Sequence, residues 1–255
     1  IAVGNPLGFV METAIMPEIK LENYVALSKE AKSKVPDAPE TVEEKEIETV
    51  IEDLRKRIGL ESSVGHSDDR AEPETTSDTK KELPELNEEF IKKFGDFKDI
   101  VAFKEKVKEN IIEQKKFETK DKRRASIADK LISETTFDVP DLIVESELDT
   151  MIGQFRADVE RSGYTLEGYL THIKKKEGDI RKEWRENAFR RARLELILKH
   201  IARLEKITLN EDEVKKEIDH ITSHHKNADR FRVRMYVENL MTNQKVFEFL
   251  ENQQI

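Results

Sequence analysis

The chain has 255 residues, of which 39% are charged and 36% hydrophobic, and its net charge is −9 at pH 7. That composition is typical of a helical protein with a thin core, and the acidic balance argues against a nucleic-acid partner. Because there is no cysteine, disulfides and thiolate metal sites are excluded, and no apolar run approaches the length of a membrane span.

The N-terminal segment is expected to be extended. It opens with IAVGNPLGFV, which lacks a basic region and is broken by Gly4, Asn5 and Pro6, so it does not form a signal peptide. It also lacks an initiator Met, and we expect the chain to be a piece of a longer protein. In residues 7–27 apolar side chains alternate with others until Pro17 interrupts the pattern, which predicts a small β element.

A first helix is expected behind Thr41, which forms a capping-box pattern with Glu44. Its apolar face comprises Ile47, Ile51, Leu54 and Ile58. Gly59 is expected to end this helix. Residues 60–82 are rich in Ser, Thr, Asp and Glu and contain almost no apolar side chain, so they are expected to form a linker or surface loop.

Helical structure is expected to resume in KKELPELNEEFIKKFG at 80–95, where Asn87 can cap a short helix and Gly95 can end it. A long helix is then expected from 99 to 134. Its ends are apolar, but EQKKFETKDKRR at 113–124 is nearly all charged. We therefore expect this helix to bridge two separately packed regions.

Apolar periodicity and capping signals predict further helices in the rest of the chain. Their expected first or capping residues are Pro140, Thr165, Asp179, Asn210 and Asp229. Trp184 lies on the apolar stripe of the helix that Asp179 opens. We expect this tryptophan to anchor the core of the C-terminal helices.

Residues 181–206 are basic, with nine Lys or Arg against four Asp or Glu. A face that binds nucleic acid would combine such charges with aromatic side chains that stack on bases, and no such interleaving occurs here. We therefore expect a solvated helix face with i,i+4 pairs such as Arg191–Glu195. A contact with the acidic helix at 40–53 is a further interpretation.

Three histidines, His220, His224 and His225, follow Glu217 at the end of a predicted helix. A zinc protease would carry a glutamate base between two histidines, in the pattern His-Glu-x-x-His, and none stands between His220 and His224. We therefore expect a solvated helix end and no metal site.

The order of these segments resembles that of bacterial trigger factor, a ribosome-associated chaperone. The segments that carry the resemblance are GNPLGFVMETAIMPEIKLENY at 4–24, TVEEKEIETVIEDLRKR at 41–57, KELPELNEEFIKKFG at 81–95, FDVPDLIVESELDTM at 137–151, LNEDEV at 209–214 and KVFEFL at 245–250. The third of them is the most specific match. The resemblance covers nearly the whole chain outside 59–82.

This resemblance implies a mainly α fold, an elongated multi-helical C-terminal domain of the trigger factor and SurA type, with helical arms around a cradle and a small β element at the N-terminal end. Residues 1–58 would be the linker strand and helix that follow an upstream ribosome-binding domain, 59–82 a polar loop, and 83–255 the helical chaperone domain with its arms. The ribosome-docking signature of the family, Gly-Phe-Arg-x-Gly-Lys, does not occur, since GNPLGF at 4–9 is not a version of it.

The family carries an FKBP-like prolyl-isomerase domain where residues 59–82 stand here. These 24 residues contain no Phe, Tyr or Trp, and their only sizeable apolar side chains are Leu60 and Val64. Such a segment cannot build several strands around an aromatic-lined pocket. We therefore expect the isomerase domain to be missing and the chain not to be an enzyme.

The function that the resemblance implies is that of an ATP-independent chaperone of the cytoplasm, which binds unfolded or nascent polypeptides and meets the ribosome through the upstream domain. The chain has no Gly-rich phosphate loop, and no cofactor, membrane or direct nucleic-acid partner is expected. The sequence leaves open whether the chain forms a homodimer. Met and Phe adapt to many shapes, although most of them are ordinary core residues. The candidate client-binding residues are Met151, Phe155, Met235, Met241 and Phe247.

Two alternatives stay open. The first is a periplasmic chaperone of the SurA type, whose helical body is related. The second is a helical scaffold with one fixed protein partner. Broad and weak binding to many unfolded clients would distinguish a chaperone from a scaffold.

Overall fold

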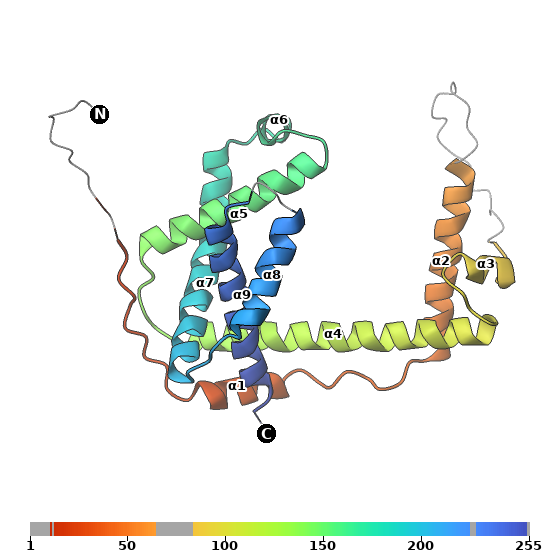
Figure 1. The fold of residues 1–255 in the computed structure, drawn as a ribbon, viewed down its shortest axis with the longest axis horizontal. Coiled ribbons are helices and arrows are strands. Elements are labelled where there is room, and N and C mark those ends of the chain that lie inside the picture. The colour runs from red at the N-terminus through yellow and green to blue at the C-terminus, as the bar shows by residue number, and fades with distance from the viewer. Residues whose placement is uncertain (1–10, 12, 65–83, 225–227, 254–255) are drawn as a thin grey trace. The chain divides into compact units, whose positions relative to one another are not determined.

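The computed structural model describes residues 11, 13–64, 84–224 and 228–253, with the backbone alone for 60–64 (Figure 1). Within this part of the chain all regular structure is α-helical, which confirms the mainly α fold. The helices are α1 (Tyr24–Ser33), α2 (Glu44–Val64), α3 (Glu88–Lys92), α4 (Ile100–Glu134), α5 (Asp141–Arg161), α6 (Leu166–His172), α7 (Glu177–Leu204), α8 (Glu211–His224) and α9 (Arg230–Glu251). In the described residues no helix is both long and apolar enough to cross a lipid bilayer.

The chain divides into two compact units, each with a core of its own. The first unit comprises residues 1–34 and 123–255, and the second comprises residues 35–122. Helix α4 contributes to both cores, because Phe103 lies in the core of the second unit and Ile127 in that of the first. This confirms that the long helix connects two packed regions.

The second unit is built from α2, α3 and the first part of α4, so helices from both sides of residues 59–82 share one core. Its buried side chains include Ile47, Ile51, Phe90, Ile91, Phe103 and Val107. Asn87 caps α3 as expected, since its side-chain oxygen accepts a hydrogen bond from the Phe90 N–H at 2.9 Å. A salt bridge of 2.7 Å between Lys115 and Glu46 joins α4 to α2.

Gly59 does not end α2, which runs on to Val64, so that expectation is wrong. A Cβ added to Gly59 would lie 3.5 Å from the Cδ atom of Pro84, which precedes α3. Close by, the Nε of Arg55 donates a hydrogen bond of 2.6 Å to the Pro84 carbonyl. A Cβ 3.5 Å from Pro84 would make an ordinary contact, so packing against Pro84 does not require a glycine here.

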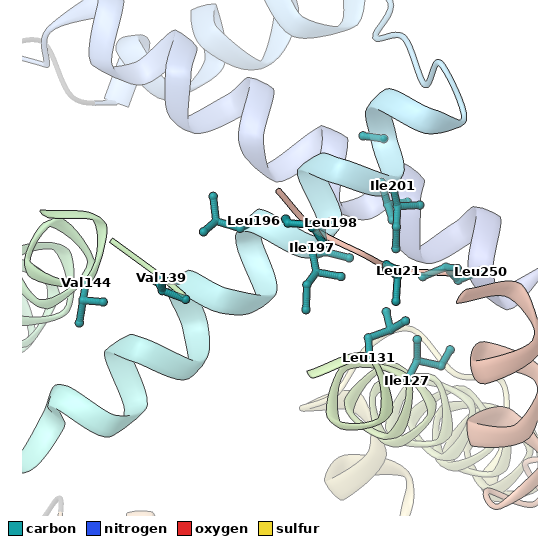
Figure 2. Packing of buried hydrophobic residues seen from close by; sticks show 14 of the residues in the cluster. Leu21, Ile127, Leu131, Val139, Val144, Leu196, Ile197, Leu198, Ile201 and Leu250 are labelled. Atoms are coloured by element: carbon teal, nitrogen blue, oxygen red, sulfur yellow. The ribbon is translucent and has the colours of Figure 1, made fainter. Parts of the chain in front are cut away.

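The main core of the first unit gathers side chains from α1, α4, α5, α7 and α9 (Figure 2). Its buried members include Leu21, Ile127, Leu131, Val139, Val144, Leu196, Ile197, Leu198, Ile201 and Leu250. Two smaller clusters extend it. One, here called the α6 cluster, lies among α5, α6 and α7 around Leu170. The other lies between α8 and α9 around Val237.

Trp184 joins two of these clusters. It is partly buried and packs against both the main core and the α6 cluster. Its ring lies edge-on to that of Phe155, with 5.3 Å between the centroids. Trp184 is thus an anchor, as its place on the apolar stripe predicts, although its side chain is not fully enclosed.

The small β element expected in residues 7–27 is not found in the described part of that range. Residues 13–23 are neither helix nor strand, and α1 begins at Tyr24. Ile19 and Leu21 are buried in the main core while Lys20 between them is exposed. The described residues of the alternating stretch before Pro17, such as Ile15, are exposed, and burial in the main core begins only at Ile19. Residues 7–10 and 12 lie outside the described residues.

Candidate functional site

A groove of about 740 Å³ lies on the first unit. It is lined by α5, α7 and α9, and by Ala14 and Met16 of the extended N-terminal segment. Helix α7 packs against both α5 and α9, so the core below the groove holds its walls together. The groove is therefore a feature of one compact unit and needs nothing from residues 35–122.

The rim of the groove is apolar and open to solvent. Five large apolar side chains that line it are between 42% and 61% exposed. They are Met16, Leu142, Met235, Tyr236 and Leu240. Single exposed apolar residues are common on protein surfaces, but several gathered at one hollow mark a surface that binds another molecule.

The floor of the groove carries charges that are paired with one another. Glu195 accepts a salt bridge of 2.6 Å from Lys199 and a hydrogen bond of 3.4 Å from the Asn239 side chain. Glu147 forms a salt bridge of 3.4 Å with Arg191, which belongs to α7. Burial raises the pKa of the Glu147 carboxyl above its usual range, although Arg191 opposes the change. Because these carboxylates pair with neighbouring Lys and Arg side chains, a molecule in the groove would meet mainly apolar side chains and little net charge.

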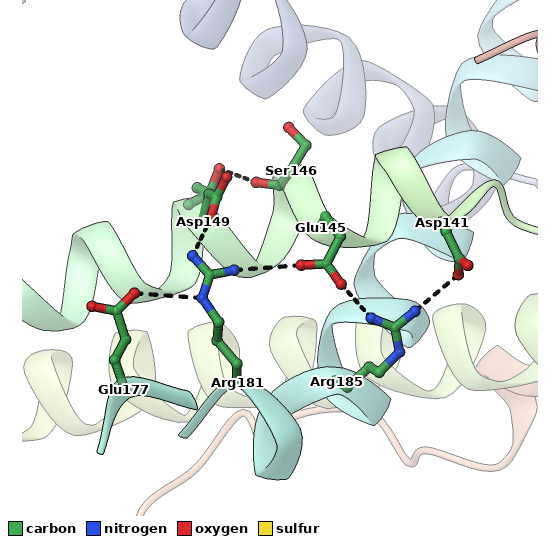
Figure 3. Close-up of polar contacts among 8 residues, drawn as sticks. Asp141, Glu145, Ser146, Asp149, Glu177, Arg181 and Arg185 are labelled. Atoms are coloured by element: carbon green, nitrogen blue, oxygen red, sulfur yellow. Dashed lines mark hydrogen bonds and ion pairs between the residues drawn. The ribbon is translucent and has the colours of Figure 1, made fainter. Parts of the chain in front are cut away.

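The basic face of α7 is occupied by α5, which explains the charge pattern of residues 181–206 (Figure 3). Arg181 pairs with Asp149 and with Glu145, and Arg185 pairs with Glu145 and, at 2.9 Å, with Asp141. Each pair is partly exposed and contributes little alone. The network nevertheless sets α5 alongside α7 and so positions the wall that carries Leu142.

The expected pairing of Arg191 is wrong. Arg191 bridges to Glu147 of α5, and Glu195 pairs with Lys199 instead. The preceding residue, Arg190, pairs with Asp129 of α4. The acidic partners of Arg190 and Arg191 thus come from neighbouring helices of the first unit, while pairs spaced i,i+4 within α7 do form between Glu177 and Arg181 and between Glu195 and Lys199.

The candidate client-binding residues separate into two groups. Met235 is 52% exposed and lines the groove. The other four are partly buried and pack into apolar clusters. Met151 and Phe247 pack on the main core, Phe155 on the α6 cluster and Met241 on the cluster between α8 and α9.

The sequence interpretation missed four residues of the rim: Met16, Leu142, Tyr236 and Leu240. Tyr236 and Leu240 are one helical turn apart on α9. The buried side of α9 is formed by Val237, Val246 and Leu250. A signal was present, since the apolar residues of α9 are too many for one face of a helix.

A second apolar hollow, of about 500 Å³, lies between α8 and the first turns of α9. Val214 and Ile218 lie at its base, and Phe231, which is 69% exposed, lies at its edge. Arg234 bridges the two helices through a 3.0 Å salt bridge to Glu211. The first unit therefore presents apolar surface at more than one place.

The histidine cluster does not build a metal site in the part of the chain that is described. His220 and His224 stack edge-on with 5.0 Å between the ring centroids, at the end of α8. Among the described residues no three His, Cys, Asp or Glu side chains are grouped to hold an ion. His225 lies outside the described residues.

The family model and the relatives that match this chain all point to the same protein family. The family model for "Bacterial trigger factor protein (TF) C-terminus" matches residues 99–255. A relative named Trigger factor from Caldicellulosiruptor bescii is 31% identical over 141 residues, which are 55% of this chain and 32% of the relative. Those from Anoxybacillus flavithermus and Bacillus cytotoxicus are 32% and 34% identical, over 56% and 54% of this chain and 34% and 33% of their own length. The match thus spans about a third of the length of these relatives.

Proposed function

Since the chain belongs to the bacterial trigger factor family, we propose that it is an ATP-independent chaperone that binds unfolded or nascent polypeptides. The observation that carries the proposal is the open groove with its rim of five exposed apolar side chains. An unfolded chain exposes apolar residues that would otherwise associate with those of other chains. The groove covers them reversibly, and the abundant surface charge keeps the complex soluble.

The size of the groove argues for weak binding at several places. Full burial of a Leu or Met side chain contributes about 1.5–3 kcal/mol, so the four half-exposed rim side chains of α5 and α9 contribute roughly 3–6 kcal/mol. A micromolar complex needs about 8 kcal/mol net of the freedom that the client loses. One groove is therefore too weak alone, and the hollow beside Phe231 would supply a second contact. Simultaneous contacts raise the overall affinity through effective concentration.

Prolyl isomerisation is not part of the proposed activity. Residues 59–82 lack the aromatic side chains of an isomerase pocket, and we propose that they join 1–58 to 83–255 in place of that domain. Residues 65–83 lie outside the described part of the structure. Cytoplasmic location and contact with the ribosome through an upstream domain are proposed from the family alone.

The test is light scattering from a reduced, denatured lysozyme that is diluted into ATP-free buffer with and without the chain. We expect suppression of aggregation, and we expect Tyr236→Ser to weaken it. Tyr164→Ser is the matched control, because Tyr164 is 65% exposed and Tyr236 61%, but Tyr164 does not line the groove. No suppression at a several-fold excess of the chain, or equal loss in both variants, would contradict the proposal. A panel of unrelated denatured proteins separates a chaperone from a scaffold with one partner.

A further inference from the structure

Residues 13–16, here called the strap, run past the edge of the groove without helical structure. Ala14 and Met16 line the groove, whereas Ile15 between them is 85% exposed and does not line it. In an extended chain successive side chains point to opposite sides. One side of the strap therefore faces the groove and the other faces solvent. An extended client segment bound in the groove would place its side chains in the same alternating way.

The strap is anchored at one end and loosely held at the groove. Ile19 and Leu21, three and five residues beyond its C-terminal end, are buried in the main core. Among the described residues no backbone hydrogen bond involves residues 13–16. Met16 also keeps 44% of its surface exposed. The strap is thus kept in place by its tether and by weak apolar contact, and both permit displacement.

We propose that the strap is a built-in competitor, which covers one edge of the groove until an extended client segment displaces it. This inference rests on the proposed function of the groove. A short tether holds a segment at an effective concentration of the order of millimolar, so even a weak contact is populated. If the strap covers the groove for half to nine-tenths of the time, it lowers the affinity for clients about two- to tenfold.

The first test compares Met16→Ser with Ile15→Ser, a neighbouring variant that removes apolar surface outside the groove. The probe is a short fluorescein-labelled peptide in which Phe and Ser alternate, and its binding is measured by anisotropy. Met16→Ser is expected to tighten binding about two- to tenfold, and Ile15→Ser to leave it unchanged. Unchanged or weaker binding by Met16→Ser overturns the proposal, because Met16 would then be neutral or part of the client surface.

The second test follows the strap itself. The chain has no cysteine, so Met16→Cys accepts a single solvent-sensitive dye. Saturating peptide is expected to shift the dye emission toward that of a fully solvated dye. Peptide that binds without this shift overturns the competition and leaves the chaperone function standing. If no peptide binds the wild-type chain, the proposed function of the groove fails as well.

In the labelled chain without peptide, Leu142→Ser should shift the dye emission in the same direction, since it removes apolar surface that lines the same groove. This measurement does not depend on any client. An emission that Leu142→Ser leaves unchanged would show that the strap does not rest on the groove, and the proposal would fall on that result alone.

Discussion

Replacing Trp184 should separate the α6 cluster from the main core of the first unit. Removing a fully buried Trp costs about 3–5 kcal/mol. Trp184 is only partly buried, so we expect Trp184→Ala to lower the free energy of unfolding of the first unit by roughly 2–3 kcal/mol. About 1 kcal/mol of this is the edge-to-face contact with Phe155.

The assay is hydrogen exchange followed by mass spectrometry, together with urea unfolding followed by circular dichroism. In Trp184→Ala the amides of α6 should lose protection while those of α3, in the second unit, should not. Trp184→Phe is the control, because it keeps an aromatic ring and should lose less. Equal loss of protection in both units would refute the reasoning. So would a wild-type fluorescence maximum typical of fully solvated Trp, since this is the only Trp of the chain.

Three further predictions follow from separate features. The hydrogen bond that the Tyr24 hydroxyl donates to Glu205 raises the pKa of Tyr24 to about 12. The protonated hydroxyl therefore stabilises the folded state fully below the unfolded pKa of about 10, and this stabilisation is lost as pH rises through about 12. Urea midpoints from pH 9 to 12 should therefore fall less in Tyr24→Phe than in the wild type. The chain should not accelerate cis/trans isomerisation of a Pro peptide, which takes tens of seconds or more uncatalysed; a saturable acceleration would contradict the proposal that residues 59–82 replace the isomerase domain. Replacing residues 66–79 by a short Gly/Ser linker should leave the thermal melt unchanged, because their polar composition cannot offset an ordering cost of roughly 1–2 kcal/mol per residue; a loss of several degrees would show that they pack.

The starts of α6 and α9 were predictable, because capping depends on residues that are neighbours in the sequence. The Thr165 side chain accepts from the Gly168 N–H at 3.2 Å, and that of Asp229 accepts from the Phe231 N–H at 2.8 Å. The start of α7 was expected about one turn too late, at Asp179. Asp179 stands inside α7 and accepts a hydrogen bond of 3.0 Å from the N–H of Lys176, which is the residue at the cap.

The groove could not be predicted in the same way, because its residues come together only in the folded chain. Met235 and Met241 are equally adaptable side chains on one helix, yet only Met235 lines the groove. What separates them is the direction in which α7 and α8 approach α9. The same reason explains Arg191, whose partner Glu147 lies 44 residues away on α5.

The central claim is that the groove between α5, α7 and α9 receives unfolded polypeptide, and site-specific photo-crosslinking tests it most directly. Since the chain has no cysteine, Leu240→Cys and Tyr164→Cys can each carry one benzophenone. Both positions are exposed, but only Leu240 lines the groove. Illumination with reduced, denatured lysozyme is predicted to give a cross-link from position 240 that the unlabelled alternating peptide competes away, and little from 164. Equal cross-linking from both positions, or none from 240, would contradict the account.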